Sequence, residues 1–131
     1  MSSTVVSKEM LVRAIVDSTA EAQYGASNIL KNPDYLKVEE RRTVVRLAYW
    51  LTEVASDARE ENLPSLIYMD LSLPVLREAR EKLESRLYAV AGNHWDFRYG
   101  HFVEKLFRGV EDTLLNIKSL RNFVESNKAE S

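Results

Sequence analysis

Cysteine is absent from this chain of 131 residues, and proline and glycine are scarce, with three and four copies. Without thiols the chain can form no disulfide framework, no thiolate metal site and no cysteine nucleophile. The four glycines are scattered, so they form no glycine-rich phosphate loop. No apolar run approaches the length of a membrane-spanning helix, and the first residues lack the basic and apolar regions of a signal peptide. We therefore expect an intracellular, cytoplasmic protein without a membrane partner.

Charge of neither sign is in large excess. The 18 basic and 20 acidic side chains leave a formal charge of -2, whereas general electrostatic binders of nucleic acid usually carry a clear basic excess. Any contact with phosphates would have to come from a local patch. A hydrophobic fraction of 45% and a charged fraction of 29% are typical of a folded globular chain, and the length predicts a single domain, residues 1–131.

The last third of the chain has the clearest helical pattern. No proline interrupts residues 96–127, and apolar residues recur along this stretch at helical spacing, every seven positions with leucines between them: Val103, Val110, Ile117 and Val124, with Leu106, Leu114 and Leu120. This seam predicts a long helix that packs lengthwise against other helices. The partner helices can lie in the same bundle or across a subunit boundary.

A first helix is expected over residues 8–31, with Ser7 as its N-cap. Small residues recur along one side of it, where a second helix backbone can approach closely. They are Ala14, Ser18, Ala22 and Ala26, with Gly25 beside them. Two interpretations stay open at this point: ordinary close packing, or a functional groove.

The second helix is expected over residues 34–62, with Asn32 capping it and Pro33 at its first position. It should end near Asn62, because Pro64 disfavours a helical conformation at the residue before it. Its apolar face predicts which residues enter the core: Val44, Leu47, Ala48, Leu51, Val54, Ala55 and Ala58.

A third helix is expected over residues 74–91, with Gly92 as a left-handed stop. Before it, Pro64 and Pro74 bracket a connector whose residues 66–69 are apolar, and which is either a buried extended segment or a short helix. Together these segments predict an all-α, single-domain bundle of four main helices with a proline-bracketed connector. The core face of the third helix should be Leu76, Ala79, Leu83, Leu87 and Val90.

The two histidines are the first candidates for a metal site. His94 and His101 would lie about 10 Å apart on a helix, too far to share one zinc ion. The Glu-x-x-His motif of four-helix di-iron sites is absent, because Ala91 and Arg98 stand three positions before the histidines. No Gly-x-Ser-x-Gly nucleophile motif is present. We therefore expect no catalytic residue, no metal and no cofactor, and enzyme activity only if a partner chain completes a site.

Residues 93–102 hold four aromatic rings and both histidines. Aromatic rings beside arginine can stack on bases or contact a partner protein, and Trp95 and Phe97 are the candidates for this role. The alternative is that Trp95, Tyr99 and Phe102 close the end of the bundle.

Basic residues form two local patches that can contact a sugar–phosphate backbone: Arg98, His101, Lys105 and Arg108 on the fourth helix, and Arg41, Arg42 and Arg46 on the second. The spacing of three, four and three residues puts the first patch on one helix face. Acidic residues lie close to both patches in the sequence, so each can also be an ordinary solvated face. Neither patch indicates base reading.

Residues 83–125 resemble the small helical subunit of type III CRISPR effector complexes. The similarity lies in the end of the third helix, residues 86–92, and in the two ends of the fourth, residues 102–103 and 121–125. This resemblance implies a compact helical bundle that stacks in rows along a guide–target duplex and contacts its backbone without catalysis. It would make Arg98 and Arg108 the nearest candidates for backbone contacts.

The architecture is also similar to that of the coat proteins of filamentous archaeal viruses, which are small, cysteine-poor, all-helical chains that wrap DNA. That similarity would make Pro33, Pro64 and Pro74 helix bends and would place the protein in a virion. The expected partners are copies of the chain or other assembly subunits, with nucleic acid contacted through the local basic patches. A protein–protein adaptor or dimerising helical module without nucleic acid is the alternative.

Overall fold

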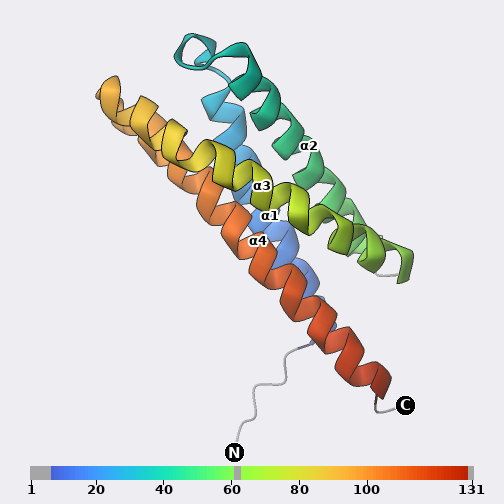
Figure 1. Ribbon diagram of the computed structural model, residues 1–131. Helices are drawn as coiled ribbons and strands as arrows, with labels where there is room; N and C mark the ends of the chain where they lie inside the picture. Colours follow the sequence, from blue (N-terminus) through green and yellow to red (C-terminus); the bar gives the residue numbers. More distant parts are fainter. Residues whose placement is uncertain (1–6, 61–62, 130–131) are drawn as a thin grey trace, which may run out of the picture.

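The computed structural model describes residues 7–60 and 63–129, with backbone alone for residues 33, 63–72 and 127–129. The described residues form four α-helices and one 3₁₀ turn (Figure 1): α1 (Lys8–Ile29), η1 (Pro33–Tyr35), α2 (Val38–Glu60), α3 (Leu63–Asn93) and α4 (Phe97–Ala129). This part of the chain contains no strand, and the prediction of an all-α bundle is confirmed.

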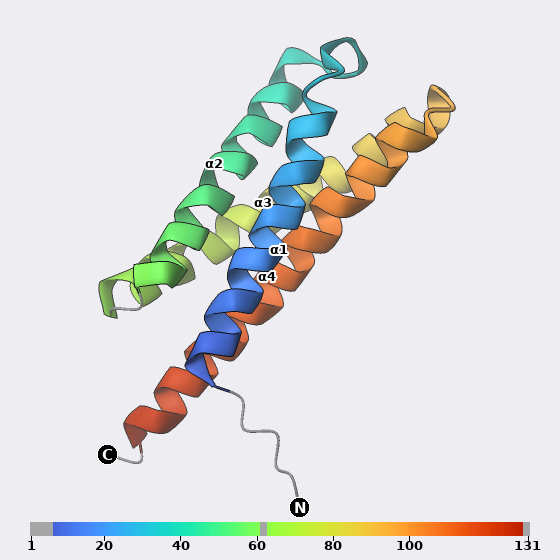
Figure 2. The same cartoon turned by 180° about the vertical axis from the view of Figure 1, so that it is seen from behind.

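The helices run alternately up and down the bundle (Figures 1 and 2), so that α1 begins and α4 ends at the same end of the molecule. The pair α1 and α4 makes the most extensive contact, while α2 packs on α1 and α3, and α3 packs on α4. The outer side of α2 is therefore left without a covering helix. This side carries the larger of the two surfaces described below.

The apolar seam of α4 is buried as predicted. Val103, Leu106 and Val110 are fully buried, Ile117 and Leu120 are nearly so, and the remaining two predicted members pack partly buried against the same core. The predicted core face of α3 is buried throughout, and that of α2 is buried except for Ala48, which is partly exposed. Helical periodicity therefore identified most of the core of α2, α3 and α4, although it did not single out the buried Phe107.

The small residues of α1 serve close packing against α4. A Cβ atom built on Gly25 would lie 2.5 Å from the carbonyl oxygen of Phe102, and one built on Gly109 would lie 2.6 Å from the backbone nitrogen of Ala22. At each of these two points the glycine of one helix lies directly against the backbone of the other. Of the two interpretations of this row of small residues, close packing is confirmed.

The predicted start of the second helix was wrong by four residues. Residues 33–35 form a 3₁₀ turn in which the Tyr35 N–H donates to the carbonyl of Asn32, and α2 begins only at Val38. The Glu40 carboxylate accepts a hydrogen bond of 2.9 Å from the Lys37 N–H, and the Lys37 carbonyl accepts from the Arg41 N–H. These are the bonds of a helix that starts after Lys37, so Asn32 is not the cap of α2.

The predicted start of the third helix was also wrong. The backbone of the expected connector is helical, and α3 runs without interruption from Leu63 to Asn93 with Pro74 inside it. Pro64 lies in the first turn, where a proline is tolerated because its missing N–H has no intrahelical partner. Pro74 removes one intrahelical hydrogen bond, but the helix continues past it. The side chains of residues 66–69 lie outside the described part of the chain.

Candidate functional site

The corner between α3 and α4 is closed by Trp95 in a left-handed conformation, with φ of 51°. Its N–H donates to the carbonyl of Gly92, and the Asp96 N–H donates to the carbonyl of Ala91. This is the Schellman arrangement, which usually places glycine at the left-handed residue. The prediction that Gly92 is the left-handed stop was therefore wrong, because the stop lies three residues later, at a tryptophan.

Contacts from the α1–α2 loop fix this corner in place. The Asp96 carboxylate caps α4 by accepting 2.9 Å from the Tyr99 N–H, and it accepts 3.0 Å from the Tyr35 hydroxyl. The Tyr35 ring stacks on His94 at a centroid distance of 4.0 Å. The Tyr99 N–H, and then the Tyr35 hydroxyl, lower the pKa of the Asp96 carboxyl. Because Asp96 must face both groups, the backbone one residue earlier, at Trp95, has to turn.

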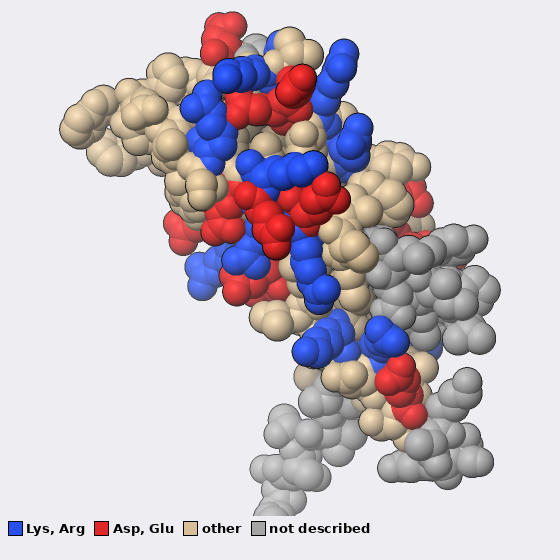
Figure 3. Space-filling view, viewed as in Figure 1, with Lys and Arg blue, Asp and Glu red and all other residues tan. Residues whose placement is uncertain are grey.

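Trp95 and Phe97 project from this corner with 82% and 84% of their surface exposed. In Figure 3 the corner forms the uncharged protrusion at the upper left. Tyr99 is buried and Phe102 is half-buried, so these two rings close the end of the bundle as expected, whereas Trp95 does not. Two adjacent exposed aromatic rings at a strained turn are typical of a contact surface. We call Trp95 and Phe97 the aromatic corner.

The strain at Trp95 predicts that Trp95→Gly stabilises the fold by about 1 kcal/mol, because glycine adopts the left-handed conformation without a steric cost. The measurement is the free energy of unfolding in urea. Phe97→Ala is the control, since Phe97 is equally exposed but lies in helical backbone. A Trp95→Gly variant less stable than the wild type would mean that the indole ring contributes packing that outweighs the strain.

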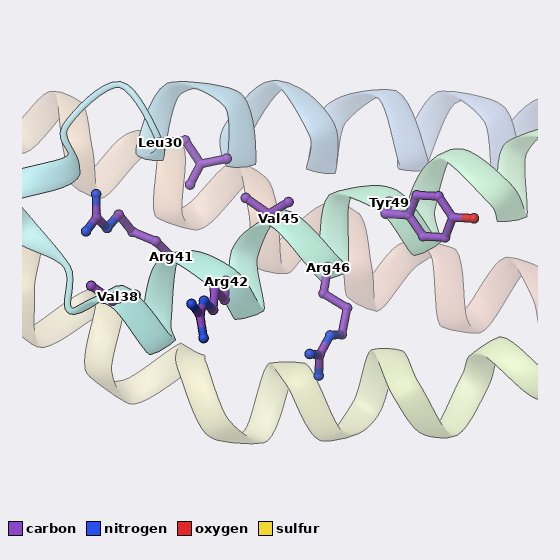
Figure 4. A pocket seen from close by; sticks show the side chains of 7 residues that line it. All are labelled: Leu30, Val38, Arg41, Arg42, Val45, Arg46 and Tyr49. Carbon is purple, nitrogen blue, oxygen red and sulfur yellow. The ribbon is translucent and has the colours of Figure 1, made fainter.

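A second surface lies on the outer side of α2 (Figure 4), and we call it the α2 face. It is a shallow hollow lined by arginines and apolar side chains: Leu30, Val38, Arg41, Arg42, Val45, Arg46 and Tyr49. Three of its large apolar residues are about half exposed, Val38 at 53%, Val45 at 54% and Tyr49 at 60%. Exposed apolar residues grouped on one helix face, rather than scattered, indicate an interaction site.

The arginines of the α2 face border its apolar residues. Figure 4 shows Val45 and Tyr49 on the side of α2 that faces Leu30, with Arg46 reaching toward α3 and Arg41 toward the loop before α2. Within the described residues, no carboxylate lies within ion-pair distance of any of the three arginines. Arg46 lies near Glu78 on α3 and, after Lys82, helps to lower the pKa of that carboxyl. The Nε of Arg41 is buried, so Arg42 is the most freely available of the three charges.

The neighbouring carboxylate Glu40 does not neutralise this surface. It turns away to Arg86 on α3, with an oxygen 2.8 Å from the guanidinium Nε. Burial raises the pKa of the Glu40 carboxyl, but the hydrogen bonds from the Lys37 N–H and from Arg86 outweigh burial, and the pKa lies below its ordinary value. Glu40 is thus held as a carboxylate by groups other than Arg41 and Arg42.

The four predicted basic residues of α4 are not brought together into one free surface. Lys105 pairs with Glu21 on α1 at 3.3 Å, and Arg108 lies 4.0 Å from Glu104. The remaining two line different hollows: Arg98 lies beside Asn28 and Lys31 at the end of α1, and His101 lies beside the aromatic corner. A backbone contact by these residues stays a prediction.

Sequence reasoning found the arginines of the α2 face but missed its apolar half. Val38, Val45 and Tyr49 follow one another at intervals of seven and four residues, and Val45 is adjacent to the buried Val44. This spacing is a second apolar stripe on α2, on the side turned away from the core stripe. This stripe was the feature of the sequence from which the apolar half of the α2 face could have been predicted.

Comparisons of the chain with protein-family models, with curated proteins and with solved structures find no match. Among the described residues, no three His, Cys, Asp or Glu side chains lie close enough together to hold a metal ion. Nor is any helix in that part of the chain both long and apolar enough to cross a membrane. Within the described residues, the aromatic corner and the α2 face are the two surfaces on which exposed large apolar side chains are grouped.

Proposed function

We propose that this chain is a non-catalytic helical subunit of a nucleoprotein assembly, and that it contacts the nucleic-acid backbone through the α2 face. The observation that carries the proposal is the grouping of Arg41, Arg42 and Arg46 around one hollow, with no carboxylate of the described residues within ion-pair distance of them. A guanidinium group is a planar fork of donors that matches phosphate oxygens. Because the chain as a whole carries a charge of -2, attraction to a polyanion is confined to such a local face.

The aromatic corner is the proposed contact with neighbouring subunits, either copies of this chain or other proteins. Tryptophan and other aromatic residues supply much of the binding energy at protein interfaces when a partner covers them. Trp95 and Phe97 are exposed in the single chain, and the loop contacts that fix Asp96 hold them in one orientation. A coat protein of a filamentous virus would use the same two surfaces, so it is one form of this proposal.

A protein–protein adaptor without nucleic acid is the second candidate function. It is favoured by the apolar half of the α2 face, since Val38 and Val45 add nothing to a contact with phosphates. The two candidates differ in one measurable property, because only the contact with phosphates releases counterions and weakens steeply with salt.

The test is a salt titration of binding to a fluorescein-labelled single-stranded oligonucleotide, followed by fluorescence anisotropy. For the triple variant Arg41→Gln, Arg42→Gln and Arg46→Gln, the slope of log K against log salt should become shallower by about 2, since each phosphate contact contributes about 0.7. The matched control removes three exposed positive charges elsewhere: Arg13→Gln, Arg77→Gln and Lys118→Gln.

The control variant should keep the wild-type slope, and circular dichroism should show both variants equally helical. Absence of binding by the wild-type protein at low salt would overturn the proposal. An unchanged slope in the α2 triple, with a reduced slope in an Arg98, Lys105 and Arg108 triple, would instead place the contact on α4.

A further inference from the structure

The α2 face is more than a group of positive charges, because apolar side chains lie between its arginines. Arg42 and Arg46 are one helical turn apart, and so are Val45 and Tyr49, which makes two neighbouring rows along the same stretch of about two helical turns. Figure 4 shows the first row on the α3 side and the second on the side of Leu30. One row is cationic, and the other is apolar and ends in an aromatic ring.

The two rows call for different groups on the ligand. The guanidinium groups suit phosphates, while the exposed Tyr49 ring and the Val45 side chain suit a flat apolar partner. A duplex offers phosphates at its surface but keeps its base faces stacked inside, so it would leave the apolar row uncovered. A single strand carries phosphates on one edge and free base faces on the other, and aromatic side chains stack on such bases whatever the sequence.

We infer that the α2 face binds single-stranded nucleic acid in preference to duplex, with phosphates on Arg42 and Arg46 and a base on Tyr49 and Val45. The inference rests on the proposed function and adds which form of nucleic acid the site takes. Arg41 lines the loop end of the same hollow.

An acidic amphipathic helix is the other occupant that this chemistry admits. A helix bound in a groove places anchors at i, i+3 or i+4, and i+7 between two apolar walls. The α2 face has only one such wall, since α1 contributes Leu30 alone. A row about one side chain wide covers the face of a base but not the wider apolar face of a helix.

The experiment compares a labelled 12-nucleotide single strand with the duplex of the same sequence by anisotropy at one fixed salt concentration. The wild-type protein should bind the single strand about 5- to 100-fold more tightly, the range expected for stacking of one base on an aromatic side chain. Tyr49→Leu, which keeps the apolar volume but removes the ring, should lose most of this preference and leave duplex binding unchanged. Tyr49→Phe should retain the preference.

Tyr24→Leu is the matched control, because Tyr24 is a tyrosine of similar exposure, 55%, on α1, where its ring contacts Phe102. It should bind both probes as the wild type does. Equal affinity for single strand and duplex, with no effect of Tyr49→Leu but a loss in the arginine triple variant, would overturn this inference and leave the proposed function standing. Binding of a synthetic acidic amphipathic peptide, and of neither nucleic acid, would overturn both.

Discussion

Gly109→Ala is expected to lower the free energy of unfolding by about 2–3 kcal/mol, although alanine is by itself the better helix former by about 1 kcal/mol. The added methyl group would lie 2.6 Å from the backbone nitrogen and 2.7 Å from the Cβ atom of Ala22. Backbone atoms cannot rotate away as a side chain can, so α1 and α4 would have to separate along their most extensive contact. The melting temperature should fall by roughly 10 °C.

The chain contains its own controls for this prediction. A Cβ atom on Gly92 would meet nothing within 4 Å, and one on Gly100 would lie at an ordinary 3.7 Å from the Cβ of Ala91. Alanine at these two positions should stabilise the fold by about 0.5–1 kcal/mol, since both lie in helical backbone. Gly25→Ala should behave like Gly109→Ala. The measurement is the free energy of unfolding of all four variants in urea. If all four substitutions changed this free energy in the same direction, the result would contradict the close approach of α1 and α4.

Features that depend on local pattern could be predicted from the sequence. The Ser7 cap of α1 is confirmed by its side chain, which accepts a hydrogen bond from the Met10 N–H. The buried faces of α2, α3 and α4 follow from helical spacing, because a residue's side of a helix is fixed by its position alone. The row of small residues on α1 predicted a close approach but not its partner, since Gly109 lies on a helix far along the chain.

Features that depend on distant contacts could not be predicted. Trp95 adopts its left-handed conformation because Asp96 must face both Tyr99 and Tyr35, and Tyr35 lies 61 residues earlier in the chain. The usual preference for glycine at the left-handed residue that ends a helix predicts Gly92 for this position instead. The prediction drawn from Pro64 was right that the second helix ends close to Asn62 but missed that α3 begins at Leu63, because a proline can mark a helix end or a helix start. Which of the two applies depends on whether the preceding helix has already ended, and α2 ends at Glu60.

Of the α2 face, only the arginines were predicted from the sequence, because only their clustering is local. Arg41, Arg42 and Arg46 are adjacent in sequence, so their clustering is local. The exposure of Val45 and Tyr49 depends on there being no helix over that side of α2, which only the assembled bundle shows. An apolar residue that faces away from the core is ordinary when it is alone. It becomes informative when it lines a hollow together with arginines that form no close ion pair among the described residues.

A pair of hydroxyl groups is buried between α1 and α4, the two helices that the glycines bring together. Thr113→Val should lower the free energy of unfolding by about 1–3 kcal/mol. The Oγ atoms of Ser18 and Thr113 are 2.8 Å apart, and Thr113 also bonds to the carbonyl of Gly109. Valine has nearly the same shape, so little packing is lost, but it leaves Ser18 with one partner fewer in a buried position.

Thr43→Val is the control, because the Thr43 hydroxyl makes the same type of bond to the carbonyl four residues earlier but is accessible to water. It should change the free energy of unfolding by less than about 0.5 kcal/mol. The double variant Ser18→Ala and Thr113→Val should lose less stability than the sum of the two single variants, because each single variant already removes the one bond that the two hydroxyls share. Strict additivity in this double-mutant cycle would mean that the two hydroxyls do not interact. The polar contacts between α1 and α4 would then include the Asn116 side-chain bond to the Ala14 carbonyl and the Lys105–Glu21 ion pair.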